Sequence, residues 1–167
     1  MIMRSIVLVV YNVRSAHNVG SMLRTADGLG IAKVHLCGYT PYPSSQDDTR
    51  LPHLAAKTSR QIHKTALGAE NSVIWHYQPD IKKLLNELGA QDYTLVALEQ
   101  TDKAIDLRAL KPSGKIALVV GSEVGGLPRT VLDMCDKHVY IPMSGKKESF
   151  NVAVAAAIAI YHLSLIA

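Results

Sequence analysis

The chain has 167 residues, of which 48% are hydrophobic and 19% charged, and its formal net charge is +4. This length supports one hydrophobic core rather than two, and the composition is that of an ordinary globular protein, so we expect a single domain. Cys37 and Cys135 form no metal-ligand or redox motif and fit reduced thiols of a cytosolic protein. The basic excess suits a nucleic-acid partner but does not require one.

Neither export nor membrane insertion is predicted. The first apolar run, Ile6–Tyr11, is too short for a signal peptide and has no cleavage site of small residues after it. The last run, Val152–Ala167, has no formal charge but is shorter than the roughly 20 residues of a membrane span. We therefore expect a cytoplasmic protein.

Strand and helix patterns alternate along the whole chain. Short apolar or β-branched runs predict strands at Ser5–Val10, Lys33–Cys37, Val73–Tyr77, Tyr93–Leu98, Ile116–Val120 and His138–Ile141. Helices are expected from Asn18 to the glycines at 28 and 30, at Lys57–Leu67, at Asp80–Leu88, near Arg129–Met134 and from about Ser149. This order predicts an α/β fold with a mainly parallel sheet, and no repeat or linker divides it.

The polar loop from Asn12 to Asn18 leads into the first helix. Asn18 is a suitable N-cap, and Arg24 lies one and a half turns beyond it, from where its side chain can stretch back over the loop. A capped helix with a surface arginine explains the same pattern equally well.

The middle of the chain is less regular. The segment Tyr39–Ala56 has three prolines and no periodicity, which indicates either a functional loop or a disordered one. In the helix that follows it, one face carries Lys57, Arg60, His63 and Lys64. That face is either a track for phosphates or simply a solvated charged surface.

The last third of the chain carries the strongest local signal. Two buried strands end in the loops 121–128 and 142–145, which are rich in glycine and small residues. Ligands of α/β proteins bind at such strand ends, and Glu123 stands in the first loop, as a site residue or as a turn residue. Ser149 and Asn151, taken alone, are more typical of helix caps. The glycine spacing matches neither a dinucleotide fingerprint nor a P-loop.

The terminal helix is apolar nearly all round, so it requires burial on more than one side. A second subunit is the favoured neighbour, and a simple core helix is the alternative.

Three motifs in order give the chain a family resemblance. They are N-x-R-x-x-x-N-x-G-x-x-x-R (12–24), L-V-V-G-S-E-x-x-G-L-P (118–128) and I-P-M-x-G-x-x-x-S-F-N-V-x-V-A-A-A-I (141–158). Together they resemble the SpoU/TrmH-like branch of the SPOUT methyltransferases. The resemblance implies an α/β-knot domain with a C-terminal trefoil knot and a homodimer that uses the terminal helix. It also implies S-adenosylmethionine as methyl donor, S-adenosylhomocysteine as product, an RNA ribose 2′-OH as acceptor, and no metal.

The resemblance also implies roles for individual residues. Those matching the family's catalytic positions are Asn18, Arg24, Glu123, Ser149 and Asn151. Those matching its donor-binding positions are Leu98, Gly121, Ile141, Ser149 and Phe150. Phe150 stands where leucine is usual, and Val124-Gly125 replaces a common Gly-Arg pair, which bears on substrate choice.

Several alternatives stay open. The family is held to use the arginine as a base, but a guanidinium is not deprotonated in proteins, so the safer role for Arg24 is to clamp the phosphate and stabilise the developing alkoxide. The proton would then leave through Glu123, Ser149 or water. A non-catalytic RNA-binding module and a base-methylating enzyme are rival hypotheses. The first strand begins near Met1, which leaves no room for an N-terminal RNA-binding domain, and tRNA is slightly favoured over rRNA.

Overall fold

The computed structural model describes residues 5–111 and 114–165. Its centre is a seven-stranded sheet in the order β3-β2-β1-β6-β4-β7-β5, and every pairing is parallel. The strands are β1 (Ile6–Tyr11), β2 (Lys33–Cys37), β3 (Trp75–Gln78), β4 (Tyr93–Leu98), β5 (Ile105–Asp106), β6 (Lys115–Val120) and β7 (Lys137–Tyr140). The helices are α1 (Ala16–Gly28), α2 (Pro52–Ala66), α3 (Ala69–Ser72), α4 (Ile81–Ala90), η1 (Leu107–Ala109), α5 (Arg129–Leu132) and α6 (Val152–Leu165).

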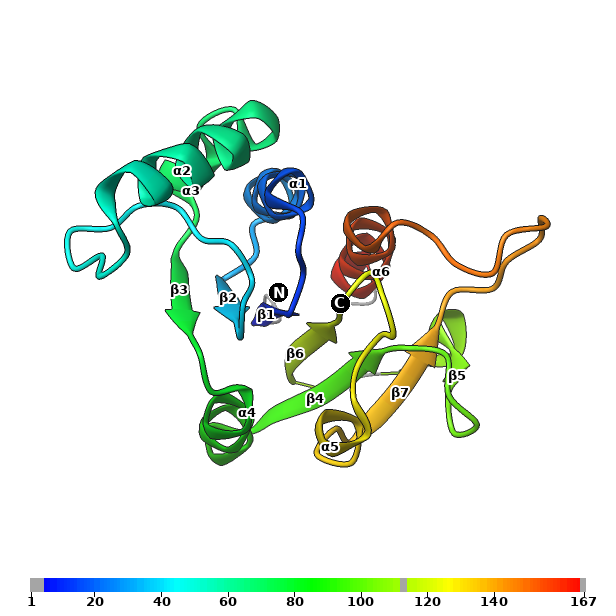
Figure 1. The fold of residues 1–167 in the computed structure, drawn as a ribbon. Helices are drawn as coiled ribbons and strands as arrows, with labels where there is room; N and C mark the ends of the chain where they lie inside the picture. Colours follow the sequence, from blue (N-terminus) through cyan, green and yellow to red (C-terminus); the bar gives the residue numbers. More distant parts are fainter. Residues whose placement is uncertain (1–4, 112–113, 166–167) are drawn as a thin grey trace.

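Helices cover both faces of the sheet. The helices α1, α2, α3 and α6 lie on one face, and α4 and α5 on the other (Figure 1). The central strands are buried on both sides, so they read as continuous apolar runs. In β1, for example, Leu8 packs toward the first layer and Val9 toward the second, and neither is exposed. The predicted α/β fold with a mainly parallel sheet is confirmed.

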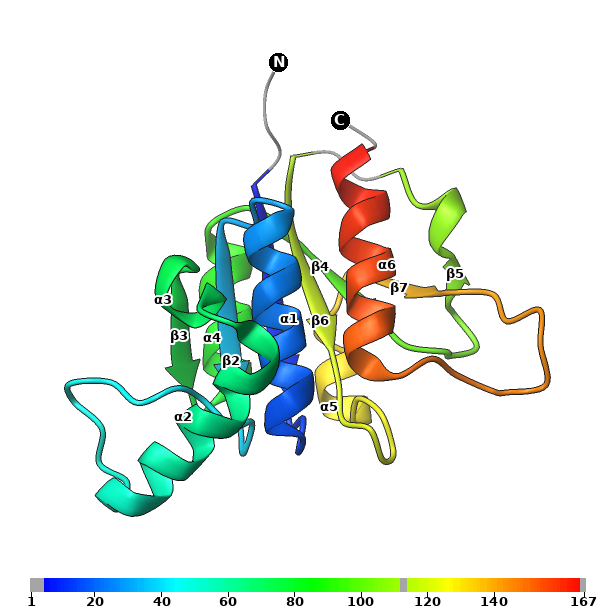
Figure 2. The ribbon, with the colours of Figure 1, turned by 90° about the horizontal axis from the view of Figure 1, so that it is seen from above.

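Helices α1 and α2 lie side by side (Figure 2) and approach closely at Gly20. A Cβ atom on Gly20 would lie 2.2 Å from Oγ1 of Thr65 and 2.3 Å from the carbonyl oxygen of Ile62. The Thr65 hydroxyl donates a hydrogen bond to the carbonyl oxygen of His17, at 2.8 Å, across the same contact. Only glycine at position 20 permits this approach.

We expect Gly20→Ala to lower the free energy of unfolding by about 1–3 kcal/mol, because the added methyl group must push the two helices apart. Gly28→Ala is the matched control, since Gly28 ends the same helix and a Cβ there meets nothing within 4 Å. That change should raise stability by about 0.4–1 kcal/mol by restricting the unfolded chain. Urea unfolding followed by circular dichroism measures both. Equal stability of the two variants would contradict the close-packing argument.

The predicted strands are confirmed to within two residues at either end, and β2 and β4 match in full. The predicted start of the second helix at Lys57 is wrong, because α2 begins at Pro52. Proline is well tolerated in the first turn of a helix, where its missing N–H has no intrahelical partner. Three short elements, α3, β5 and η1, were not predicted.

Two predicted helix starts also need correction. The N-cap of α1 is Ser15 rather than Asn18: the Ser15 hydroxyl accepts a hydrogen bond from the Asn18 N–H at 3.2 Å. The terminal helix begins at Val152 rather than Ser149, and Asn151 caps it. Asn18 is therefore not the N-cap of α1, and Ser149 is not the N-cap of α6.

The connection between β2 and α2 is an ordered loop organised by Arg50. Its guanidinium donates to the Asp48 carboxylate at 2.6 Å and to the carbonyl oxygens of Tyr42 and Pro43 at 3.0 and 3.2 Å. The same guanidinium lies 3.6 Å from the centre of the Tyr42 ring, which stacks on Tyr77. These contacts favour the functional-loop interpretation of Tyr39–Ala56 over disorder.

Helix α6 lies beside α1 on the first face of the sheet (Figure 2). Neither α6 nor any other helix within 5–111 and 114–165 combines the length and apolarity that crossing a bilayer demands.

Candidate functional site

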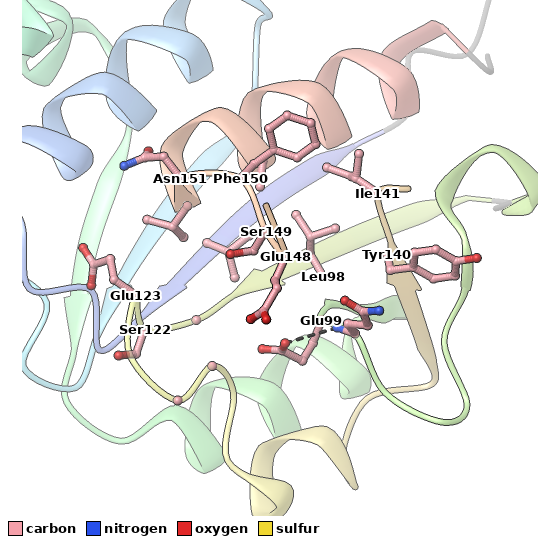
Figure 3. Close-up of a pocket in the computed structure, with 17 residues that line it drawn as sticks. Leu98, Glu99, Ser122, Glu123, Tyr140, Ile141, Glu148, Ser149, Phe150 and Asn151 are labelled. Carbon is pink, nitrogen blue, oxygen red and sulfur yellow. Dashed lines mark hydrogen bonds between the residues drawn. The ribbon is translucent and has the colours of Figure 1, made fainter. Parts of the chain in front are cut away.

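A cleft of ≈ 570 Å³ opens at the carboxyl ends of three neighbouring strands, β6, β4 and β7. The loop after β1, the next strand in the sheet, borders the same region. The cleft is lined by four segments, 98–100, 120–126, 140–141 and 148–155. In Figure 3, Glu123 and Asn151 lie at one end of it, and Tyr140 and Ile141 at the other. The site therefore lies where a parallel sheet is expected to hold a ligand.

The Glu123 carboxylate ties the loop after β6 to the start of α1. It accepts hydrogen bonds from the N–H groups of Arg14 (3.0 Å) and Ser15 (3.3 Å) and from the side-chain amide of Asn18 (2.9 Å). Both carboxylate oxygens are engaged. Glu123 thus connects two parts of the chain that are more than 100 residues apart.

Asn151 extends this cluster to the start of α6. Its side-chain amide donates to Oδ1 of Asn18 at 3.2 Å, and its own Oδ1 accepts from the N–H of Ala153 at 2.9 Å. The cap predicted for Asn151 is therefore confirmed, but the same side chain also belongs to the site. Asn18, Glu123 and Asn151 form one chain of hydrogen bonds, which we call the polar cluster.

The polar cluster keeps Glu123 ionised. Partial burial raises the pKa of this carboxyl, but the hydrogen bonds from Arg14, Asn18 and Ser15 outweigh burial and hold the pKa below its usual range. A carboxylate with a lowered pKa that already accepts three hydrogen bonds is a poor proton acceptor at neutral pH. The geometry makes Glu123 a group that positions its neighbours.

Glu99 anchors the far end of the same loop. Its carboxylate accepts hydrogen bonds from the N–H of Leu127 at 2.9 Å and of Gln100 at 3.1 Å. Gly126 has φ +64°, and a Cβ there would lie 2.2 Å from Oε2 of Glu99. Glycine is thus required by both the backbone and the close approach. The loop is fixed at two points, by Glu123 to α1 and by Glu99 to β4.

The structure brings most of the predicted site residues together. All five predicted donor-binding residues line the cleft: Leu98, Gly121, Ile141, Ser149 and Phe150. Of the other predicted catalytic residues, Glu123 and Asn151 also line it, and Asn18 joins them through the polar cluster.

Arg24 is the exception. It lines a separate shallow hollow with Ser21, Thr25, Lys64 and Thr65, between α1 and α2. Helix α6, which borders the cleft, lies on the other side of α1 (Figure 1). Arg24 lies nine residues beyond Ser15, the N-cap of α1, and its side chain lines the hollow rather than the cleft.

Residues of the cleft that were not predicted include Glu99, Gln100, Tyr140 and Glu148. The first two directly follow a buried parallel strand, so the strand-end rule could have found them. Figure 3 shows the carboxylates of Glu99 and Glu148 pointing into the cleft. Glu148 stands in an irregular loop, where no sequence pattern marks it.

The sequence pattern of the SpoU rRNA Methylase family matches residues 5–161 of the chain. The chain belongs to this family. Residues from all three motifs meet at the cleft or in the polar cluster, and Arg24 of the first motif lies outside both.

Comparisons with individual proteins agree with this assignment. The SpoU chain is 32% identical over 159 residues to the 23S rRNA (guanosine-2'-O-)-methyltransferase RlmB of Acinetobacter baylyi, covering 95% of the chain. It spans about 58% of the length of the curated relatives that it matches.

Two solved structures share the fold. One is the SpoU methyltransferase AviRb of Streptomyces viridochromogenes in complex with the cofactor AdoMet. It has a TM-score of 0.78 and 22% identity, over 99% of this chain and 61% of that one. The other concerns the 2-OH methylation of C/U34 on tRNA, with a TM-score of 0.74 and 25% identity, over 95% of this chain and 93% of that one.

Proposed function

We propose that the SpoU chain is an S-adenosylmethionine-dependent RNA methyltransferase that acts on a ribose 2′-OH. The observation that carries this proposal is the polar cluster, which joins Asn18, Glu123 and Asn151 at the rim of the cleft. Its members come from three separate motifs of the family. The guanosine-2'-O activity named for the Acinetobacter relative supports ribose as acceptor.

Transfer RNA is the proposed substrate. The relative concerned with 2-OH methylation of C/U34 on tRNA is matched over 93% of its length, so it has almost the same extent as this chain. The longer RlmB relative acts on 23S rRNA, which is the second candidate substrate.

The residues of the cleft fit the methyl donor. A volume of ≈ 570 Å³ lies within the range of about 300–1,000 Å³ typical of small-molecule sites. Leu98, Ile141 and Phe150 provide apolar walls for a purine, and the Glu99 and Glu148 carboxylates suit a cationic ligand. When bound, the donor supplies an electrophilic methyl group on a positively charged sulfonium.

The chain's own residues would then prepare the acceptor. The polar cluster fixes the loop after β6, the start of α1 and the start of α6 relative to one another, so that an RNA ribose at the rim faces the cleft. The Ser149 hydroxyl lines the cleft and has no hydrogen-bond partner within 5–111 and 114–165. We assign Ser149 the role of a proton relay: its oxygen accepts the hydrogen bond and then the proton from the 2′-OH, while its own hydroxyl proton passes to solvent water. Glu123 is less suited to this step because it already accepts three hydrogen bonds and its pKa is lowered.

We also propose a homodimer with α6 at its seam. The helix buries Ala153, Ala156, Ile160 and Leu163 against the core but leaves another apolar stripe in solvent. The stripe consists of Val154 (48% exposed), Ile158 (37%), Tyr161 (55%) and Leu165 (63%), which follow one face at i, i+4, i+7 and i+11. An exposed apolar stripe of this kind is typical of a protein interface.

Three further expectations belong to the proposal. The chain forms a single domain, and its C-terminal part forms a trefoil knot, as the family resemblance implies. We also expect a cytoplasmic location, where the free Cys37 and Cys135 would stay reduced.

In the decisive experiment, the protein is incubated with labelled S-adenosylmethionine and either unfractionated tRNA or rRNA. The RNA is then digested with nuclease, and its nucleosides are identified by mass spectrometry. We expect a 2′-O-methylated nucleoside from tRNA. A methylated base would contradict ribose chemistry and support the rival enzyme class. Donor binding by calorimetry without any transfer to either RNA would support the non-catalytic RNA-binding module instead.

A further inference from the structure

The outer face of α2 carries a line of basic residues that the proposed site does not use. His53, Lys57, Arg60 and Lys64 stand at i, i+4, i+7 and i+11, and all four are exposed. Lys64 and Arg24 of α1 line the same hollow. We call these five residues the basic track. His63, which the sequence placed on this face, instead pairs with Glu70 at 2.5 Å.

The basic track has no compensating acid. The 15 residues Pro52–Ala66 contain three Lys or Arg residues and no Asp or Glu. Within 5–111 and 114–165, neither Arg24 nor any Lys or Arg of α2 forms an ion pair. A helix face whose charges serve only solubility usually carries both basic and acidic residues, as α4 does with Lys82, Lys83 and Glu87.

The spacing also works against the helix itself. Lys57 and Arg60 are neighbours at i, i+3, and Arg60 and Lys64 at i, i+4, so like charges repel along one ridge. A helix gains nothing from this arrangement unless an external anion neutralises it. The charge pattern therefore indicates a polyanionic ligand rather than a structural role.

We infer that the basic track binds the phosphate backbone of the substrate RNA, an inference that rests on the proposed function. Eleven residues of α-helix span about 16 Å, which corresponds to about five nucleotides of a helical strand. The Pro52 end of α2 lies at the same edge of the molecule as the loop after β6 (Figure 2). An RNA strand held along α2 and across Arg24 is thus directed toward the edge where the cleft opens.

The test compares the salt dependence of tRNA binding in two matched double variants. Lys57→Gln with Arg60→Gln removes two charges from the basic track, whereas Lys82→Gln with Lys83→Gln removes two exposed charges from α4, on the opposite face of the sheet. Binding of fluorescein-labelled unfractionated tRNA is followed by anisotropy from low to high salt. Circular dichroism verifies the fold of both variants.

Each lost phosphate contact should make the slope of log K against log salt shallower by about 0.7–0.9. The slope of the variant with both track charges removed should therefore be shallower than that of the wild type by about 1.4–1.8. The slope of the α4 variant should be almost the same as that of the wild type. The same slope in both variants would overturn the inference. So would unchanged tRNA binding together with weaker binding to phosphatidylserine vesicles, which would make the track a membrane-binding surface.

The proposed function is tested separately in the same samples. Donor binding should be the same in the wild type and both variants, because the basic track does not line the cleft. If the wild type binds tRNA with a track-dependent slope but neither binds the donor nor transfers methyl groups, the inference stands and the proposed function fails.

Discussion

Replacement of Glu123 by alanine should lower kcat for methyl transfer by about 100-fold, while donor binding changes little. The substitution removes the acceptor of three hydrogen bonds, from the N–H groups of Arg14 and Ser15 and from the amide of Asn18. The loop after β6 then loses its attachment to α1, although Glu99 still holds its far end. An error of about 1 Å in the placement of reacting groups is enough for an effect of this size.

Steady-state kinetics and calorimetry with the donor measure the two quantities separately. Glu87→Ala on α4 is the control, since Glu87 is an exposed carboxylate remote from the cleft. A second test uses Asn18→Ala and the double variant. If Glu123 and Asn18 act as one unit, the double variant should lose little more activity than Glu123→Ala alone. Fully additive losses would show that the polar cluster is not a functional unit.

The lowered pKa of Glu123 adds a pH criterion. Hydrogen bonds to the ionised form of Glu123 hold its folded-state pKa below the ordinary glutamate value. The stability that these hydrogen bonds contribute is therefore complete above the ordinary glutamate pKa and is lost as the pH falls through the lowered value. Above about pH 5 the wild type should therefore show no titration of Glu123 in its rate profile. An inflection near neutrality that disappears in Glu123→Gln would instead identify Glu123 as the proton acceptor.

The sequence predicted most of the sheet because its central strands are buried on both faces. Runs such as Tyr93–Leu98 leave little choice of conformation, and β4 matches in full. β5 has only two residues, and no periodicity can reveal so short a strand. The start of α2 was missed because Pro52 was read as a loop residue, although proline also suits the first turn of a helix.

The site was predictable where it depends on strand ends and less so where it depends on packing between helices. The glycine-rich loops after β6 and β7 marked the cleft, and the residues matched to the family's donor positions all line it. The bond between Asn18 and Asn151 joins residues 133 positions apart, so only the folded chain reveals it. The location of Arg24 depends on the close contact of α1 with α2 at Gly20, which no local pattern specifies.

Replacement of Arg24 by alanine should lower kcat/KM for methyl transfer to tRNA by about 10- to 150-fold. This range corresponds to the loss of one hydrogen-bonded contact with a charged group, about 1.5–3 kcal/mol. Arg24 lies in the hollow beside Lys64 rather than in the cleft, so we assign its contact to an RNA phosphate. Donor affinity should be unaffected. Arg24→Lys should recover part of the loss, because lysine keeps the charge but not the bidentate geometry.

The division of the effect between KM and kcat separates this role from base catalysis. A phosphate contact made equally in the ground state and the transition state raises KM and leaves kcat unchanged. Loss of a catalytic base would instead lower kcat and change the pH profile. A guanidinium holds its proton throughout the accessible pH range, so the first outcome is expected. A fall in kcat with unchanged KM would contradict the phosphate role and would require Arg24 to act at the reacting atoms rather than in the hollow between α1 and α2.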